Sequence, residues 1–207
     1  MFDFTSFIPR AVSQGIPLLL GSTGEIITEK SGNLNLGLPG VMYVGAISGV
    51  IGSFFYEQSL ADPSDINAFL AIFIPVICSL IGSLIMGLIF CFLTITLRAN
   101  QNVTGLAMTT FGVGFGNFFG GSLLSFFGET GSISLLKTGN CYKAKLPFAD
   151  NLGLFGKTFL SLGFLAYLAI IIALVTSYVL NRTRTGLNLR AVGENPATAD
   201  AAGINIT

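Results

Sequence analysis

The chain has 207 residues, of which 52% are hydrophobic and 10% charged, and its ten basic residues balance ten acidic ones. An ordinary soluble domain is about 25% charged, so this composition excludes a soluble enzyme and indicates that lipid is the solvent. The balanced charge favours no nucleic-acid partner, and the absence of histidine removes the commonest metal ligand and general base. We therefore expect no catalytic residue, no metal site and no cofactor bound by this chain.

Apolar runs predict the architecture. They cover approximately residues 11–21, 38–56, 69–97, 103–127 and 158–181. A membrane-spanning helix needs about 20 residues, and the last four runs reach that length. The first reaches it only by extending over 9–28; otherwise it is a partial helix. The runs predict an all-α, polytopic transmembrane bundle of about five spans, forming one membrane domain over 1–207.

A polar stretch, GEIITEKSGNLNLGLPG at 24–40, separates the first two apolar runs. Glycines and Pro39 punctuate it, so we expect no continuous helix through 37–40. One interpretation is an ordinary loop. The other is a discontinuous helix at membrane depth, where freed N–H and C=O groups contact solute. Asn33 and Asn35 would then supply neutral donors and acceptors, suited to hydroxyl groups or a nucleobase edge.

Small residues recur at helical spacing in two of the apolar runs. In TTFGVGFGNFFGG they are four residues apart and share one helix face, which lets another backbone approach closely. A nucleotide-binding interpretation fails because these glycines lie inside an apolar span rather than between a strand and a helix. The predicted packing residues are Gly112, Gly116 and Gly120, with Ser79, Ser83 and Gly87 on the preceding helix.

Polar connections join the runs. Residues 57–68 are acidic and rich in turn formers, residues 98–102 (RANQN) form a tight corner, and residues 128–157 form a long loop. The side chains of the corner are either simply solvated or line a translocation path. Lysine and arginine divide evenly between the two sets of loops, so charge does not determine the orientation.

The tail, residues 182–207, carries a helix signature. Asn195 precedes Pro196 as an N-cap precedes the first helical position, Ala-rich residues 196–202 follow, and Gly203 supplies a left-handed stop. A helix of two turns is marginal alone in water, so it must pack on something. It is either a connector between spans or a docking element for a soluble partner at the membrane face.

Three stretches together carry a family resemblance: GEIITEKSGNLNLGLPGVMYVGA, LRANQNVTGLAM and TRTGLNLRAVGENPATADAAGINI. In this order and at these intervals they resemble motifs of inner-membrane permeases of ATP-binding-cassette (ABC) importers. The resemblance is to the branch that handles branched-chain amino acids, simple sugars and nucleosides. Within that branch, the chain is most similar to the nucleoside and simple-sugar members.

The resemblance implies a multi-pass permease subunit of the bacterial inner membrane that translocates nucleosides or simple sugars. It implies no enzymatic activity of the chain itself, because ATP is used by a separate cytoplasmic ABC ATPase. The other implied partners are a second permease subunit, identical or different, an extracytoplasmic solute-binding protein, and membrane lipid. Family members continue beyond this point with further spans, so we expect the chain to be an N-terminal portion.

The resemblance also implies roles for particular residues. It places 98–102 and the tail in the cytoplasm, and 57–68 and 128–157 outside. It assigns the polar stretch of 24–40 to the solute pathway as a broken helix. The implied pathway residues are Asn33, Asn35, Gly37 and Gly40. To these we add Asn100, Gln101 and Asn102 of the corner as candidates, from their polar side chains rather than from the resemblance. The implied ATPase-coupling residues are Arg190, Ala191, Gly193, Glu194, Asn195, Pro196, Asp200, Ala201 and Gly203.

Two other classes of protein compete with the importer subunit. An autonomous secondary transporter would need a coupling-ion site, typically built from buried carboxylates, and no acidic residue falls within the four long apolar runs. A non-transporting membrane scaffold would explain the small-residue faces but leaves the polar stretch without a purpose.

Overall fold

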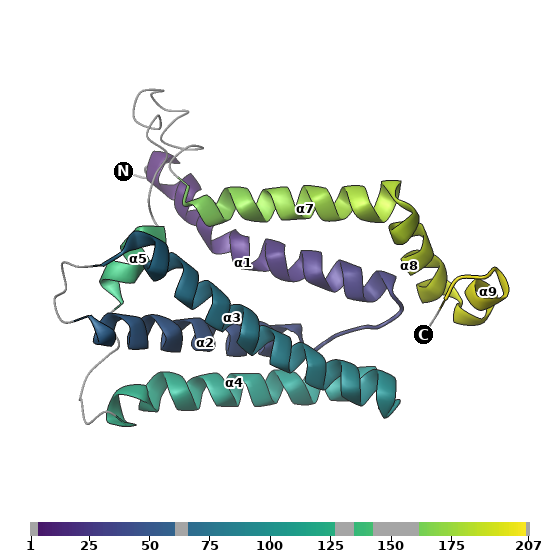
Figure 1. The fold of residues 1–207 in the computed structure, drawn as a ribbon, viewed down its shortest axis with the longest axis horizontal. Coiled ribbons are helices and arrows are strands. Elements are labelled where there is room, and N and C mark those ends of the chain that lie inside the picture. Colours follow the sequence, from purple (N-terminus) through teal and green to yellow (C-terminus); the bar gives the residue numbers. More distant parts are fainter. Residues whose placement is uncertain (1–3, 61–65, 127–134, 143–161, 206–207) are drawn as a thin grey trace. The chain divides into compact units, whose positions relative to one another are not determined.

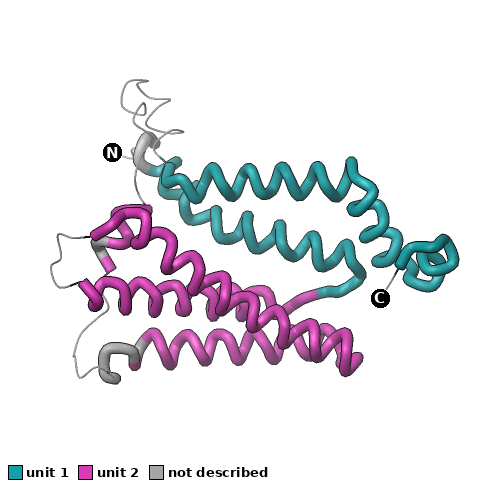
Figure 2. The backbone as a smooth tube through the Cα atoms, in the orientation of Figure 1, with its two compact units in different colours: residues 1–34, 143–207 teal, residues 35–142 magenta. Residues whose placement is uncertain are grey.

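The computed structural model describes residues 4–60, 66–126, 135–142 and 162–205, and every regular element in these ranges is helical (Figure 1). The chain divides into two compact units, residues 1–34 with 143–207 (unit 1) and residues 35–142 (unit 2) (Figure 2). Unit 2 contains α2 (Leu38–Ser59), α3 (Ala68–Cys91), the π-helical turn η1 (Phe92–Thr96), α4 (Gln101–Phe126) and α5 (Leu136–Tyr142). Unit 1 contains α1 (Phe4–Lys30), α7 (Phe164–Arg182), α8 (Arg184–Glu194) and α9 (Pro196–Ala201).

In unit 2, α2 packs against both α3 and α4. A methyl group at Gly49 would lie 3.2 Å from the Pro75 carbonyl oxygen, and one at Gly112 would lie 2.5 Å from the Gly40 Cα. The helices therefore approach until backbone meets backbone, which is how helices associate where lipid removes any hydrophobic drive. The buried apolar cluster of this unit is Val44, Met86, Phe90 and Met108, with Val41 and Phe115 packed against it.

The outer face of α3 carries leucines that no described residue covers. Leu80, Leu84 and Leu88 recur every four residues and are 60–64% exposed. A soluble monomer rarely exposes a continuous apolar stripe of this kind. This face therefore suits contact with lipid.

In unit 1, α1 and α7 lie side by side (Figure 1). The chain turns sharply from α7 into α8 at Thr183, whose hydroxyl accepts a hydrogen bond from the Gly186 N–H at 3.2 Å. A Cβ at Gly186 would overlap the backbone of Val179 and Leu180. The absence of a side chain there allows α8 to start directly against the end of α7.

Helices form at all five apolar runs of the sequence, and the all-helical prediction is confirmed for the described residues. Three of these helical stretches are long and apolar enough to cross a membrane: Leu38–Ser59, Ala68–Thr96 and Phe164–Arg182. Helix α1 carries two glutamates and a lysine near its end, and α4 is rich in glycine and threonine. That α1 and α4 also span remains a prediction. The part of the last run at 158–161 lies outside the described residues.

Candidate functional site

The polar stretch contains a short non-helical segment, residues 31–37, which we call the polar segment. Helix α1 ends there in a Schellman motif: the Gly32 N–H donates to the Glu29 carbonyl at 3.0 Å and the Asn33 N–H to Thr28 at 3.1 Å. Gly32 has a φ of +91°, a left-handed conformation that favours glycine. The end of α1 is thus set by Gly32, and the segment leaves it with these last carbonyl groups satisfied.

Helix α2 begins at Leu38. The Asn35 side-chain oxygen accepts a hydrogen bond from the Gly37 N–H at 2.9 Å, and Pro39 lies in the first turn of the helix. Proline is tolerated there because first-turn N–H groups have no helical partner. As expected, no continuous helix runs through residues 37–40, because Gly37 is the N-cap, outside the helix, and α2 starts after it. The non-helical part is shorter than the polar stretch 24–40, since α1 continues to Lys30.

The end of the polar segment lies against α4. The Thr109 hydroxyl donates to the Leu36 carbonyl at 2.8 Å, and a Cβ at Gly105 would lie 2.8 Å from the Gly37 nitrogen. A Cβ at Gly40 would overlap the carbonyl of Met108. Gly37 and Gly40 thus allow a close helix contact, a packing role that the sequence analysis did not assign to them.

The corner before α4 is held by Asn100. Its side-chain oxygen accepts hydrogen bonds from the N–H groups of Asn102 at 3.0 Å and Val103 at 3.2 Å, which caps the helix. Gln101 and Asn102 are the first residues of α4, one turn before Gly105. Within unit 2, the structure therefore brings the corner and Asn35–Gly37 to the same end of α4. Asn33 belongs to unit 1.

The predicted packing faces are largely present. Gly112, Gly116 and Gly120 of α4 face Gly40, the ring of Tyr43 and Ile47 of α2, in that order, and Ser79 and Ser83 of α3 lie against Gly45. Gly87 is an exception, because no described atom lies within 4 Å of a Cβ placed there. Gly82 takes its place against Ser48. Gly45, Gly49 and Gly52 were not among the predicted packing residues, although their three- and four-residue spacing in GAISGVIGS was an available signal.

The C-terminal helix α9 has the predicted ends. The Asn195 side chain accepts from the Thr198 N–H at 3.1 Å, and Pro196 is the first helical residue. At the other end Gly203, with a φ of +81°, donates to Asp200 at 2.9 Å, while Ile204 donates to Ala199 at 3.0 Å, a second Schellman motif. The local structure predicted for the tail is confirmed, with the helix ending at Ala201.

Helix α8 was not predicted, and it divides the proposed coupling residues. A Cβ at Gly193 would overlap the Lys30 carbonyl and lie 2.9 Å from the Gly32 nitrogen, so the end of α8 touches the end of α1. The Arg190 Nε atom is buried without a hydrogen-bond partner among the described residues. Arg190, Ala191 and Gly193 are half-buried, whereas Glu194, Asn195, Pro196, Asp200, Ala201 and Gly203 are exposed.

Helix α5 is the described part of the predicted loop at 128–157; the rest of that loop lies outside the described residues. The Glu57 carboxylate accepts hydrogen bonds from the Thr138 N–H at 3.0 Å and the Thr138 hydroxyl at 2.5 Å. The Tyr142 hydroxyl donates to the Ile72 carbonyl at 2.6 Å. Burial, followed by the electrostatic effect of the neighbouring Cys141, raises the pKa of the Tyr142 phenol above its ordinary value. This attachment of α5 was not predicted, because it joins residues up to 81 positions apart in the sequence.

Among the described residues, no group of three or more His, Cys, Asp or Glu side chains could hold a metal ion. Among the described residues, Cys78, Cys91 and Cys141 form no disulfide bond. The polar groups near the start of α4 include the amides of Asn35 and Asn100, the Thr109 hydroxyl and backbone atoms. Such groups can bind a neutral solute by hydrogen bonding.

Residues 7–207 match a protein family described as the permease component of the branched-chain amino acid transport system. The chain is 30% identical to the guanosine ABC transporter permease protein NupQ of Bacillus subtilis, over 96% of this chain and 59% of that protein. It is 34% identical to the nucleoside ABC transporter permease protein NupC of Lactococcus lactis, over 92% and 56%. It is 31% identical to the putative glucose ABC transporter permease protein TsgC13 of Haloferax volcanii, over 91% and 52%. The chain thus spans little more than half the length of these relatives. No solved structure matches it.

Proposed function

The chain belongs to the family of branched-chain amino acid transport system permease components, and we propose that it is part of the membrane subunit of an ABC importer for nucleosides or simple sugars. Relatives named as guanosine and nucleoside permeases resemble more than nine-tenths of the chain, which favours nucleosides. The relative named as a putative glucose permease keeps simple sugars in the proposal. The membrane would be the bacterial inner membrane.

The observation that carries this proposal is that α9 is a short helix, capped at both ends, whose surface is mostly exposed. Helix α7, which is long and apolar enough to span, leads through α8 into a helix with both ends capped. Only Ala199 of α9 is buried, at 3% exposure, while Pro196, Asp200 and Ala201 face outward. A six-residue helix is too short to be stable alone. An exposed surface of small residues on such a helix is suited to the groove of a soluble partner, and we assign that partner as the ABC ATPase.

In the proposed mechanism this chain performs no bond chemistry. The ATPase binds and hydrolyses ATP, and its movement is passed to α9 and α8. Because Gly193 of α8 lies against Gly32 and Lys30 of α1, movement of α8 would be passed to the end of α1. That end is where the polar segment begins, so the motion would reach a stretch of backbone that is not held by helical hydrogen bonds.

The proposed solute pathway includes the polar segment and the start of α4. Non-helical backbone at membrane depth is tolerated where it lines a wet cavity. The proposed contributors are Asn33, Asn35, Gly37, Gly40, Asn100, Gln101 and Asn102. A solute-binding protein outside the membrane would deliver the solute, and a second permease subunit, identical or different, would complete the pathway.

Loss of the α9 cap tests the proposal. In the full-length protein expressed in its own host, replacing Asn195 and Pro196 by glycine removes the capping oxygen and the preset φ of the first turn. Glycine at the N-cap costs only a few tenths of a kcal/mol, and loss of the proline adds about 0.4–1 kcal/mol through a freer unfolded chain; the sum is large for so short a helix. We expect the ABC ATPase no longer to co-purify and ATP-dependent nucleoside uptake to fall, with the amount of permease in the membrane unchanged.

Asn195→Asp is the matched control. An aspartate keeps the capping oxygen and suits the positive end of a helix, so the ATPase should still co-purify. If the double glycine variant retains the ATPase at the wild-type level, docking through α9 is wrong. If the wild-type protein takes up neither nucleosides nor sugars in an ATP-dependent manner, the importer proposal itself is wrong.

A further inference from the structure

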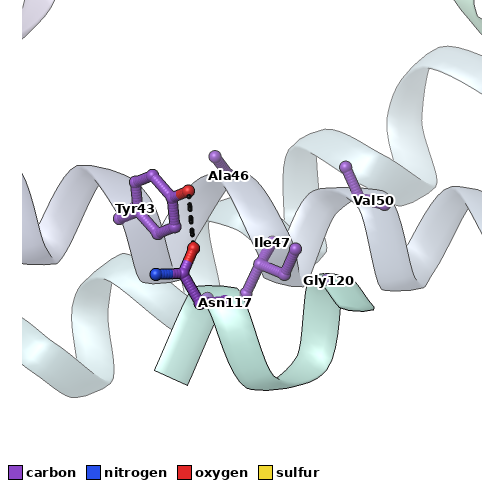
Figure 3. A pocket seen from close by; sticks show the side chains of 7 residues that line it. Tyr43, Ala46, Ile47, Val50, Asn117 and Gly120 are labelled. Carbon is purple, nitrogen blue, oxygen red and sulfur yellow. Dashed lines mark hydrogen bonds between the residues drawn. The ribbon is translucent and has the colours of Figure 1, made fainter. Parts of the chain in front are cut away.

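A pocket of about 400 Å³ lies between α2 and α4, within unit 2 (Figure 3). Its polar side chains are Tyr43 and Asn117, and Figure 3 shows the tyrosine hydroxyl directed at the amide oxygen, to which it donates at 3.3 Å. The volume falls within the range of small-molecule sites, about 300–1,000 Å³. The remaining lining residues are apolar or lack a side chain: Ala46, Ile47, Val50, Gly116 and Gly120.

The pocket lies beside the middle of an apolar helix, where polar side chains are uncommon. Residues 43–50 occupy the middle of α2, which is long and apolar enough to cross a membrane. Asn117 lies on the other wall, in the apolar sequence GFGNFFG of α4. A polar residue at membrane depth almost always faces the interior of a bundle or a wet cavity, and transporter solute sites lie near the midplane. The Tyr43–Asn117 pair therefore has the position expected of polar side chains that face a solute site.

The shape of the pocket depends on the small residues of α4. A Cβ at Gly116 would overlap the Tyr43 ring, so this glycine allows the ring to lie along α4. A Cβ at Gly120 would lie 3.3 Å from the Ile47 side chain. The Tyr43–Asn117 hydrogen bond is long, since O–H···O bonds usually measure about 2.7–2.8 Å. Both groups can therefore exchange it at little cost for bonds to a ligand.

We propose that this pocket receives the base of a nucleoside, with Asn117 and Tyr43 binding its polar edge; this inference rests on the proposed function. An asparagine amide presents a donor beside an acceptor, the pair that reads purine edges in nucleic-acid complexes. The apolar lining residues can contact a flat face of a base. A sugar has hydroxyl groups all around its ring, and these walls would leave several of them buried without partners. None of the lining residues is charged, which suits a neutral ligand.

Nucleoside uptake with altered side chains tests the pocket. The full-length gene, as wild type, Asn117→Ala or Tyr43→Phe, replaces the chromosomal copy, and initial uptake of labelled guanosine and adenosine is measured. Each variant loses hydrogen bonds to the base, so we expect KM to rise about five- to tenfold. Free guanine and adenine should compete with wild-type uptake and compete less in the variants. Ribose should compete poorly in all of them.

Asn181→Ala is the matched control, because Asn181 is a helical asparagine of α7 whose amide donates to the Ser177 carbonyl of its own helix at 2.9 Å. Its KM should equal that of the wild type. Tyr43→Phe keeps the ring against Gly116 and removes only the hydroxyl. It therefore tests base binding on its own if Asn117→Ala lowers the amount of protein in the membrane. Unchanged KM in Tyr43→Phe, with normal wild-type uptake, overturns the pocket but leaves the proposed function intact. No nucleoside uptake by the wild type overturns both.

Discussion

At the scale of single residues, the spacing between α2 and α4 depends on which positions carry no side chain. Gly112 of α4 lies against the backbone of Gly40 of α2. Neither helix can relieve a clash there by rotating a side chain. Gly114, two residues further on, has no described atom within 4 Å of a Cβ placed there. On one face of α4 a glycine is therefore required for close packing, whereas on another face of the same helix it is not.

This contrast predicts the effects of two alanine substitutions. Gly112→Ala should destabilise the protein by about 1–3 kcal/mol, because the added methyl group forces two backbones apart. Gly114→Ala adds the same methyl group to open space and should be neutral or slightly stabilising, since alanine favours a helix. Thermal unfolding of the detergent-solubilised proteins measures both. Equal melting temperatures for the two variants would contradict the α2–α4 contact.

The Tyr142 phenol offers a residue-scale prediction with a pH dependence. Its pKa is raised in the folded protein, so the folded state retains its proton over a range where the unfolded state, with a pKa of about 10, loses it. Its contribution to stability is therefore complete below about pH 10 and is lost as pH rises towards the folded pKa. Above the folded pKa, the phenolate can no longer donate to the Ile72 carbonyl.

Tyrosine ionisation is followed by near-ultraviolet absorbance as pH rises, for the wild type and for Tyr142→Phe. The two titrations should differ by one group, which ionises at a higher pH than an ordinary tyrosine. Tyr142→Phe should also cost about 1 kcal/mol at neutral pH, from the lost hydrogen bond. Tyr178 lies exposed on α7, so Tyr178→Phe is the control for stability. A difference titration with an ordinary pKa would show that Tyr142 is not buried by the packing of α5 against α3.

At the scale of elements, two helix ends organise unit 1. Helices α1 and α9 both finish in Schellman motifs at glycines with positive φ. The first of these ends also receives α8, because Gly193 lies against Lys30 and Gly32. Helix α8 thus contacts α1 at one end and follows α7 at the other, and it carries α9 beyond them.

This contact predicts that Gly193→Val separates assembly from transport. The bulky side chain would push α8 away from α1 while leaving the α9 caps and their exposed surface unchanged. We expect the ATPase to co-purify at the wild-type level and solute uptake to fall by at least about tenfold, an effect of 1.4 kcal/mol or more. Gly24→Ala, in an open position on α1, should leave both unchanged. Normal uptake in Gly193→Val would exclude a coupling route through α1.

At the scale of the whole molecule, α7 gives a prediction of sidedness. It is long and apolar enough to span, and it lies between α5 and α8 in the sequence. The family resemblance places the loop containing α5 outside and α8 in the cytoplasm. Asn140 of α5 and Asn188 of α8 are both exposed, so each accepts a label without disturbing the packing.

Single cysteines at Asn140→Cys and Asn188→Cys test this sidedness in the full-length protein after Cys78, Cys91 and Cys141 have been replaced by serine. A membrane-impermeant maleimide added to intact cells should label position 140 only. Permeabilised cells should show labelling at both positions, which is the control for reactivity. Labelling of position 188 in intact cells would reverse the proposed orientation and remove α9 from contact with a cytoplasmic ATPase.

The sequence by itself determined the features that depend on composition and on neighbours along the chain. Apolar run lengths predicted where the long helices form, and Asn195, Pro196 and Gly203 predicted α9, because caps and left-handed turns involve residues within one helical turn. The spacing of Gly112, Gly116 and Gly120 predicted a packing face. The resemblance carried by three local motifs pointed to the family that the whole chain then matched.

Only the tertiary structure decided which groups meet across the chain. The Tyr43–Asn117 pair is separated by 74 positions and the Glu57–Thr138 pair by 81, and no local pattern records such distances. Likewise, the choice of Gly82 over Gly87, and of α1 as the neighbour of Gly193, depends on how helices cross. Helix periodicity shows that a face is small or polar, but the partner of that face is set by packing between distant segments.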